Sequence, residues 1–350
     1  MSGATVLSGL AAGFLLAVSM ASGAEDCGTP GTLTSSKGDS RVLVTRVFKD
    51  GSIAVRARLA VNPDGGKGAY TVGDHGFTYI ANGLSIMRKG VRYRCDLDCR
   101  NAFLKAELKG FAEHTPEFCV YAMEVEPFAP GQARTSCGNG RYLIGNGKGR
   151  LRKGPLLDTV SGATVQSYVS TTSLRHKVDG QVQPLDSETL PIAVAAKASM
   201  LGSIVWVAGK GLHGTFALVG ESGPAFGEGS IALHQLLHTN AITAQASGPI
   251  PVGQRCSAVE SGLTPPFRSS PDKPGDGCRR GRAASSASDI RAYNGISEPV
   301  DFVVLGQAGF SRKGGLIEQT VTRQSIDEAA ARAGYTQQRI RQMLACLPRS

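Results

Sequence analysis

Short apolar runs separated by turn signals recur along this chain of 350 residues, and they limit the folds that it can adopt. Each run is rich in Val, Ile, Leu, Ala or Phe and has about the length of a strand. Turn sequences such as KDG and PDGG stand between them. The pattern predicts a predominantly β (α+β) fold, a single barrel-like β domain with a few peripheral helices. The runs are 41–48, 52–61, 118–128, 167–174, 190–196, 202–209, 214–220 and 301–306.

A few other segments carry helix signals. Ser325 and Glu328 have the spacing of a capping box, and Thr336 can cap a final short helix. Two helices joined at a glycine also occur in DNA-binding proteins, but we favour a packing role for this pair. The segments with helical spacing are 77–84 (FTYIANGL), 230–238 (SIALHQLLH) and 325–334 (SIDEAAARAG).

The first 24 residues indicate export. Segment 1–24 contains no charged side chain, carries an apolar run and ends in small residues, as a secretory signal peptide does. The apolar run is too short and too rich in Gly and Ser to favour a permanent membrane-spanning helix. We therefore expect a secreted protein, extracellular or periplasmic, that has no stable membrane anchor.

The eight cysteines agree with an oxidising compartment, because all of them follow the predicted signal peptide and an even number can pair as disulfides. Spacing leaves the pairs open. A zinc site is the alternative for the cysteines between 95 and 137, although the paired C-x-x-C spacing of zinc ribbons is missing. RCDLDCR (94–100) is interpreted as a disulfide-tethered surface turn. The cysteines are Cys27, Cys95, Cys99, Cys119, Cys137, Cys256, Cys278 and Cys346.

The formal net charge of +10 favours anionic partners such as nucleic acid, acidic glycans or membrane headgroups. The basic residues fall mainly in Gly-, Ser- and Pro-rich stretches, 141–153 and 268–291, and not on a helix face with interleaved aromatics. Nucleic acid is therefore not predicted as a partner. We interpret 269–289 as a surface excursion within one domain that spans 25–350.

Several familiar catalytic motifs are incomplete or missing. His234 and His238 share a helix face, but HQLLH lacks the glutamate of a zinc protease and no third ligand is indicated. They are interpreted as polar residues of an amphipathic helix, and neither a metal nor another cofactor is predicted. The chain has no G-x-S-x-G elbow of a serine esterase.

The stretch GESGPAFGEGS (220–230) holds two carboxylates, Glu221 at the end of a predicted strand and Glu228 just before a predicted helix. Hydrolysis of a glycosidic bond needs one carboxyl group that donates a proton and a second that activates water. A strand end and a helix start across a short turn can hold both groups, in environments different enough to separate their pKa values.

This stretch resembles the G-D-x-G-P...G-E-x-S signature of glycoside hydrolase family 75, the fungal-type chitosanases and their bacterial relatives. Further segments resemble the family in the same order, so the likeness runs from about residue 41 to about residue 335. They are 58–84, with the D-G-x-x-x-A-Y turn, 167–194, with the "V-S-x-T" strand, and the closing strand and helix at 299–310 and 325–335.

The resemblance implies an endo-chitosanase-like hydrolase that cleaves β-1,4-linked glucosamine-type glycans with inversion. Glu228 matches the family's catalytic glutamate and would be the general acid. Glu221 stands where the family has its catalytic aspartate and would be the general base, with a carboxylate one methylene further out. Asp64, Tyr70, Ser170 and Thr172 are second candidates, for lining the substrate cleft; turn geometry and strand packing are the alternative roles for them.

The expected partner is a polysaccharide, chitosan or a related cell-wall glycan, bound by a monomer. Because chitosan is a polycation, a protein of formal charge +10 would repel it unless acidic residues gather at the cleft, whereas a neutral or anionic glycan such as peptidoglycan meets no such barrier. Two alternatives stay open: a catalytically impaired glycan- or cell-wall-binding protein on the same scaffold, and a structural envelope protein.

Overall fold

The computed structural model describes residues 27–33, 42–74, 76, 78, 80–157, 164–223, 226–242, 267–268, 292–293 and 295–348. The predicted signal peptide, the excursion at 269–289, Cys256 and Cys278 lie outside the described residues.

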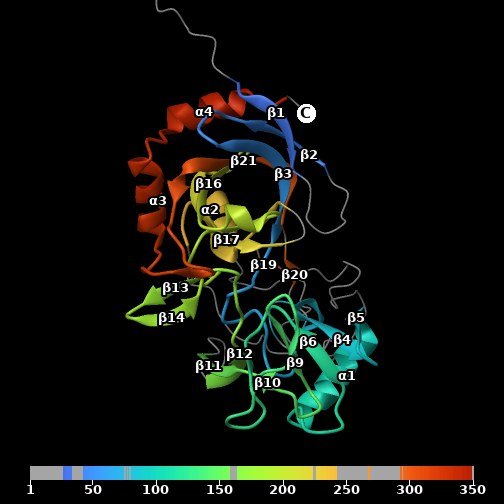
Figure 1. Cartoon of the computed structure of the whole chain (residues 1–350). Helices are drawn as coiled ribbons and strands as arrows, with labels where there is room; N and C mark the ends of the chain where they lie inside the picture. The colour runs from blue at the N-terminus through green and yellow to red at the C-terminus, as the bar shows by residue number, and fades with distance from the viewer. Residues whose placement is uncertain are drawn as a thin grey trace, which may run out of the picture.

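Six strands close into a barrel, in the upper half of Figure 1. Their order is β3, β18, β15, β17, β16 and β21, and β21 pairs again with β3. Neighbours are antiparallel except for β15 with β17 and β18 with β3, which run parallel. β1 (Thr29–Leu33) and β2 (Leu43–Val47) extend the sheet beside β3. The barrel strands are β3 (Ile53–Val61), β15 (Ile192–Ala195), β16 (Ser203–Ala208), β17 (Thr215–Ser222), β18 (Glu228–Gly229) and β21 (Ile296–Gly309).

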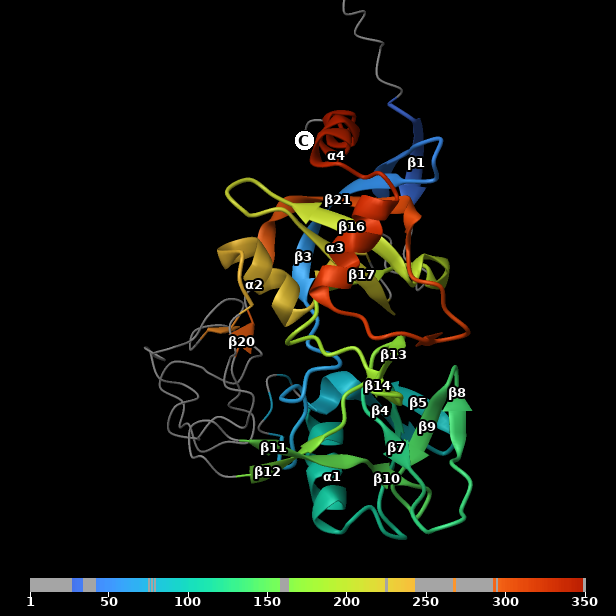
Figure 2. The ribbon, with the colours of Figure 1, turned by 90° about the vertical axis from the view of Figure 1, so that its left-hand side faces the viewer.

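The central residues of the barrel strands are buried on both faces, which explains why these strands appear in the sequence as nearly continuous apolar runs. Successive residues of one strand enter different cores: Ile204 packs in one apolar cluster and Val205 in the other. The first cluster also contains residues of α3 (Arg323–Arg332) and α4 (Gln337–Ala345), and the second contains residues of α2 (Ile231–Thr239). The helices therefore pack against the barrel strands, and Figure 2 shows α2 and α3 beside them.

A second lobe is inserted between β3 and β15, below the barrel in Figures 1 and 2. Its own core is rich in aromatic residues. The centre of the Phe103 ring lies 5.3 Å from that of Phe111 and 5.5 Å from that of Phe118. The lobe combines α1 (Leu97–Leu108) with a five-stranded antiparallel sheet. The sheet strands, in spatial order, are β5 (Val91–Arg94), β4 (Leu84–Arg88), β6 (Glu117–Val120), β9 (Arg141–Ile144) and β8 (Ser136–Gly138).

Short pairings complete the described structure. β13 and β14 form a hairpin, and β22 adds to β13 in parallel. The remaining elements are η1 (Ile80–Gly83), β7 (Val125–Glu126) with β10 (Arg150–Leu151), β11 (Lys153–Leu157) with β12 (Thr164–Tyr168), β13 (Arg175–Val178), β14 (Gln181–Pro184), η2 (Ala198–Met200), β19 (Phe267–Arg268) with β20 (Ala292–Tyr293), and β22 (Leu316–Ile317).

Three disulfides join six of the eight cysteines: Cys27 with Cys346, Cys95 with Cys99, and Cys119 with Cys137. The zinc alternative for the middle cysteines is therefore wrong. The structure thus confirms the predicted class, a mostly β protein with a barrel, a few helices and stabilising disulfides. In the part of the chain that the structure describes, no helix is long and apolar enough to cross a membrane.

Some local predictions were wrong. The stretch at 77–84 yields only the short helix η1 before the chain enters β4. The predicted turn around Cys95 and Cys99 is tethered by a disulfide, but it starts the helix α1, which Asp96 caps by accepting a hydrogen bond from the Cys99 amide. The capping box of α3 begins at Thr322, three residues before the predicted one, because the Thr322 and Ser325 side chains each accept a hydrogen bond from the other residue's amide.

Candidate active site

A cleft of about 1030 Å³ lies between the barrel and the second lobe. The barrel contributes the carboxyl groups of Asp64, Glu221 and Glu228, which we name the carboxyl cluster. The second lobe contributes residues of β5 and β9. The sequence predicted all three members of the carboxyl cluster as site residues, and the structure brings them to one cleft.

The barrel register places the two glutamates on either side of one residue. Val194 of β15 pairs with Glu221 of β17 on one side and with Glu228 of β18 on the other. The pairing of β15 with β17 is irregular here, with a register shift between Ala193 and Val194, and the shared cleft lining shows that both glutamates face the same space. Two strand spacings put the backbones of the glutamates roughly 10 Å apart. β18 in turn pairs with β3, and Asp64 follows the end of β3. The carboxyl cluster therefore comes from β17, from β18 and from the turn after β3, and β15 lies between the strands of the two glutamates.

The Glu221 carboxylate is held by several donors. The Ser173 amide donates to its Oε2 at 2.7 Å, the Ser173 hydroxyl donates to its Oε1, and the Ser222 amide lies 3.2 Å from Oε1. Burial raises the pKa of Glu221, the hydrogen bonds from Ser173 and Ser222 oppose this, and the charge of Glu228 adds to the increase. Donors of this kind favour the ionised carboxylate.

Glu228 has fewer donors. The Asn62 side-chain amide donates to its Oε2 at 3.3 Å. Burial raises the pKa of Glu228, and this hydrogen bond opposes the increase only in part. Just after it, the Ser230 hydroxyl accepts from the Leu233 amide at 3.1 Å and caps α2, which confirms the predicted helix start. Glu228 is therefore better suited than Glu221 to keep a proton.

Asp64 lies in a turn that its own neighbours fix. Its amide donates to Asn62 Oδ1 at 2.8 Å, and its Oδ1 accepts from the Tyr70 hydroxyl at 2.9 Å. Burial and the charge of Glu221 raise the pKa of Asp64 to about 7; the Tyr70 hydrogen bond opposes this, and Glu228 adds to it. Asp64 therefore carries a proton in a large share of molecules at neutral pH, which limits repulsion within the carboxyl cluster.

The other predicted residues support the site instead of facing its substrate. Tyr70 is buried in the core of the second lobe and reaches the cluster only through Asp64. Ser170 is buried; its hydroxyl accepts from the Gly65 amide and donates to the Ala122 carbonyl. Thr172 lies at the cleft, but its hydroxyl is used between the backbones of Leu174 and Leu185. These contacts agree with the alternative roles in turn geometry and packing.

Sequence reasoning missed Asn62 and Ser173. Asn62 links two members of the carboxyl cluster, since it donates to Glu228 and accepts from the Asp64 amide. Ser173 makes the closest contacts to Glu221. Both lie within two residues of the predicted site residues Asp64 and Thr172, so proximity in sequence is the available signal.

The two histidines of α2 do not form a metal site. His234 is fully buried; its Nδ1 lies 2.9 Å from the Ser230 carbonyl and its Nε2 lies 3.3 Å from the Leu59 carbonyl. Burial lowers the pKa of His234 to about 4, so the ring is neutral. Among the residues that the structure describes, no group of three or more His, Cys, Asp or Glu side chains could hold a metal ion.

We expect Asp64→Asn to stabilise the protein at alkaline pH. The folded-state pKa of Asp64 lies above the ordinary value, so the stability that protonated Asp64 contributes is complete below about pH 4 and is lost as the pH rises through about 7. Each unit of pKa difference between the folded and unfolded states is worth about 1.4 kcal/mol, so the free energy of unfolding would fall by roughly 4 kcal/mol. Partial exposure of Asp64 to solvent reduces this loss. Urea unfolding should show a gain of about 2 kcal/mol at pH 8.5 and none at pH 4.

The matched control for Asp64→Asn is Glu113→Gln, which neutralises an exposed carboxylate away from the cleft. It should leave stability nearly unchanged at both pH values. An equal stability gain for Asp64→Asn at pH 4 and pH 8.5 would contradict the assignment of a protonated Asp64.

No protein-family model matches the chain, and no curated protein matches it.

Proposed function

We propose that the protein is an exported polysaccharide hydrolase that cleaves glycosidic bonds with inversion, using Glu228 as general acid and Glu221 as general base. The observation that carries this proposal is the strand pairing of the barrel. It places Glu221 on one side of Val194 and Glu228 on the other, and both glutamates line one cleft. Inverting glycosidases hold their two carboxyl groups about 6.5 to 9.5 Å apart to leave room for water. Backbones two strands apart allow that separation.

The hydrogen bonds support the distribution of roles. Glu221 accepts from two amides and a hydroxyl, and these donors favour its ionised form against the effect of burial, which raises its pKa. An ionised Glu221 can remove a proton from water. Glu228 accepts from one side-chain amide, and burial favours its protonated form, which can protonate the leaving oxygen. In the reaction, water attacks the anomeric carbon as its proton passes to Glu221, the glycosidic C–O bond breaks, and the leaving oxygen takes the proton of Glu228.

The shape of the cleft supports a polymeric substrate. Its volume of about 1030 Å³ stands at the upper end of the range for small-molecule pockets, and it extends between two lobes. The resemblance to family 75 favours β-1,4-linked glucosamine-type glycans. The disulfides support action in an oxidising compartment, outside the cytoplasm. We propose that a monomer acts there.

The test is the release of reducing ends from chitosan, chitin and peptidoglycan by the purified mature chain. Proton NMR of the first products should show the α-anomer, because inversion at a β-linked sugar gives it. A β-anomer would contradict the roles of the two glutamates. Tight binding of a glycan without any cleavage would instead favour the alternative, a glycan-binding protein on the same scaffold.

A further inference from the structure

The second lobe lines the cleft with cationic side chains. Arg92 and Arg94 come from β5, Arg134 precedes β8, and Arg141 begins β9; we name these four residues the arginine wall. The arginine wall and the carboxyl cluster belong to different lobes but line the same cleft. A ligand that enters the cleft therefore meets both sets of charges.

Within the described part of the chain, the arginine wall has no carboxylate partners. No carboxylate in the described ranges forms an ion pair with any of its four guanidinium groups. By contrast, Glu124, which also lines the cleft, forms ion pairs with Arg152 and Arg175, with an N–O distance of 2.8 Å in each. Because uncompensated guanidinium groups repel one another, a cluster of them in a cleft favours an anionic ligand.

Tyrosine rings hold two of these arginines in place. The guanidinium carbon of Arg134 lies 4.2 Å from the Tyr142 ring centre, and that of Arg141 lies 5.0 Å from the Tyr121 ring centre. A guanidinium group stacked on a ring keeps the N–H groups of its edge free for bidentate contacts with a carboxylate. Stacking also reduces the entropy that the side chain loses when a ligand binds.

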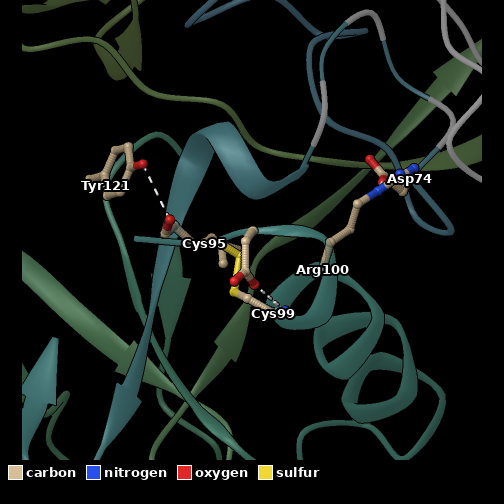
Figure 3. Close-up of a disulfide and its surroundings, with 7 residues drawn as sticks. Asp74, Cys95, Cys99, Arg100 and Tyr121 are labelled. Atoms are coloured by element: carbon tan, nitrogen blue, oxygen red, sulfur yellow. Dashed lines mark hydrogen bonds and ion pairs between the residues drawn. A yellow bond between two sulfur atoms is a disulfide. The ribbon is translucent and has the colours of Figure 1, made fainter. Parts of the chain in front are cut away.

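Tyr121 shows that the two sets of charges are near each other. Its hydroxyl donates to the Leu84 carbonyl at 3.2 Å, which fixes its position beside the Cys95–Cys99 disulfide (Figure 3). Burial raises the pKa of Tyr121, Arg141 lowers it, and Asp64 raises it. Since Tyr121, Asp64 and the arginine wall line the same cleft, a sugar bound at the carboxyl cluster lies in the space that the arginines also line.

We propose that the substrate is an acidic polysaccharide whose sugars carry carboxylate groups near the cleaved bond, and that the arginine wall binds these carboxylates. The proposal rests on the hydrolase function proposed above and narrows its substrate class. A cationic polymer such as chitosan would have to bring its ammonium groups against unpaired guanidinium groups. Carboxylates match the planar edge of guanidinium in a bidentate manner, whereas ammonium groups cannot.

The test measures the affinity of glycan oligosaccharides for the Glu228→Gln protein by calorimetry, so that cleavage does not interfere. The probes are peptide-free strands of N-acetylglucosamine and N-acetylmuramic acid, which carry free carboxylates, together with three probes that carry none: neutral chitin, cationic chitosan and sulfated, uronate-free keratan sulfate oligosaccharides. We expect the carboxylated strands to bind at least about tenfold more tightly than each of the other probes, with an affinity that falls as salt rises.

The arginine wall is tested with the double variant Arg134→Gln/Arg141→Gln. Its affinity for the carboxylated strands should fall about tenfold or more, while Arg→Lys at both positions should lose less. Arg332→Gln/Arg341→Gln, which removes two exposed arginines on α3 and α4, is the matched control and should change the affinity less than about twofold. Thermal melting verifies that each variant is folded.

The outcomes separate this inference from the proposed function. In one outcome, the protein binds carboxylated strands, the arginine variant loses this binding, and the unmodified chain cleaves no glycan. This outcome would support the inference and overturn the proposed hydrolase function. Cleavage of chitosan or chitin, with no preference for carboxylated strands and no effect of the arginine variant, would overturn the inference and keep the hydrolase. Preference for the sulfated probe would also overturn the assignment of carboxylates.

Discussion

Replacing Glu228 by glutamine is expected, under the proposed function, to lower kcat on the glycan substrate by roughly 1,000-fold or more, because glutamine cannot protonate the leaving oxygen. The amide is isosteric with the carboxylic acid and can still accept the hydrogen bond from Asn62, so the fold and the affinity for glycan should be preserved. Reducing-end assays at saturating substrate measure the effect.

A substrate that needs no proton tests the role itself. An aryl glycoside with a good leaving group, such as dinitrophenolate, departs without general-acid help, so Glu228→Gln should lose far less activity on it than on a polysaccharide. Glu328→Gln, an exposed carboxylate on α3, serves as the control and should match the unmodified chain. Equal rates for Glu228→Gln and the unmodified chain on polysaccharide would remove Glu228 from catalysis.

Breaking the buried ion pair of the second lobe should have the largest effect on stability. Arg100 reaches from the first turns of α1 to Asp74 (Figure 3), and the two side chains are 5% and 1% exposed. Arg100→Met keeps most of the side-chain volume but leaves the Asp74 carboxylate buried without its guanidinium, which costs about 3 to 5 kcal/mol. The double variant Arg100→Met/Asp74→Asn should recover part of this loss, because the amide carries no charge.

The loss of stability in Arg100→Met is expected to be confined to the second lobe. Trp206 is the single tryptophan of the chain and packs in the barrel against Phe216 at 4.8 Å, so its fluorescence reports the barrel. Hydrogen exchange followed by mass spectrometry should show faster exchange in α1 and β6 of Arg100→Met. Arg332→Met, which breaks the exposed pair with Glu328, is the control and should cost less than about 1 kcal/mol. If Arg100→Met and Arg332→Met lowered the free energy of unfolding by similar amounts, the result would contradict the stabilising role of the buried ion pair.

The barrel strands were predictable because their own residues carry the signal. Ile192–Ala195 is buried along its whole length, and such runs have few alternatives to a central strand. Helix α1 was not predictable, because its first and last residues, Leu97 and Leu108, are 63% and 87% exposed, so apolar residues do not mark one face. The second lobe was not predictable either. Its core forms from several segments, and each of them has the pattern expected for a single β domain.

The carboxyl cluster could be predicted in part for a related reason. Glu221 and Glu228 lie close in sequence, and a strand end and a helix start bring them together locally. Asp64 joins them only through the pairing of β3 with β18, which is two residues long and has no signature of its own. The arginine wall depends on how the second lobe faces the barrel. Contacts of that kind are set by tertiary packing, which local patterns do not encode.

The bond between Cys27 and Cys346 spans 319 residues, and the barrel closes only where β3 meets β21. During synthesis from the N-terminus, β1, β2 and β3 are therefore exposed long before their last partners are available. Until β21 arrives, β3 keeps an unpaired edge that other chains can join. The barrel and this disulfide can therefore form only after nearly the whole chain is available.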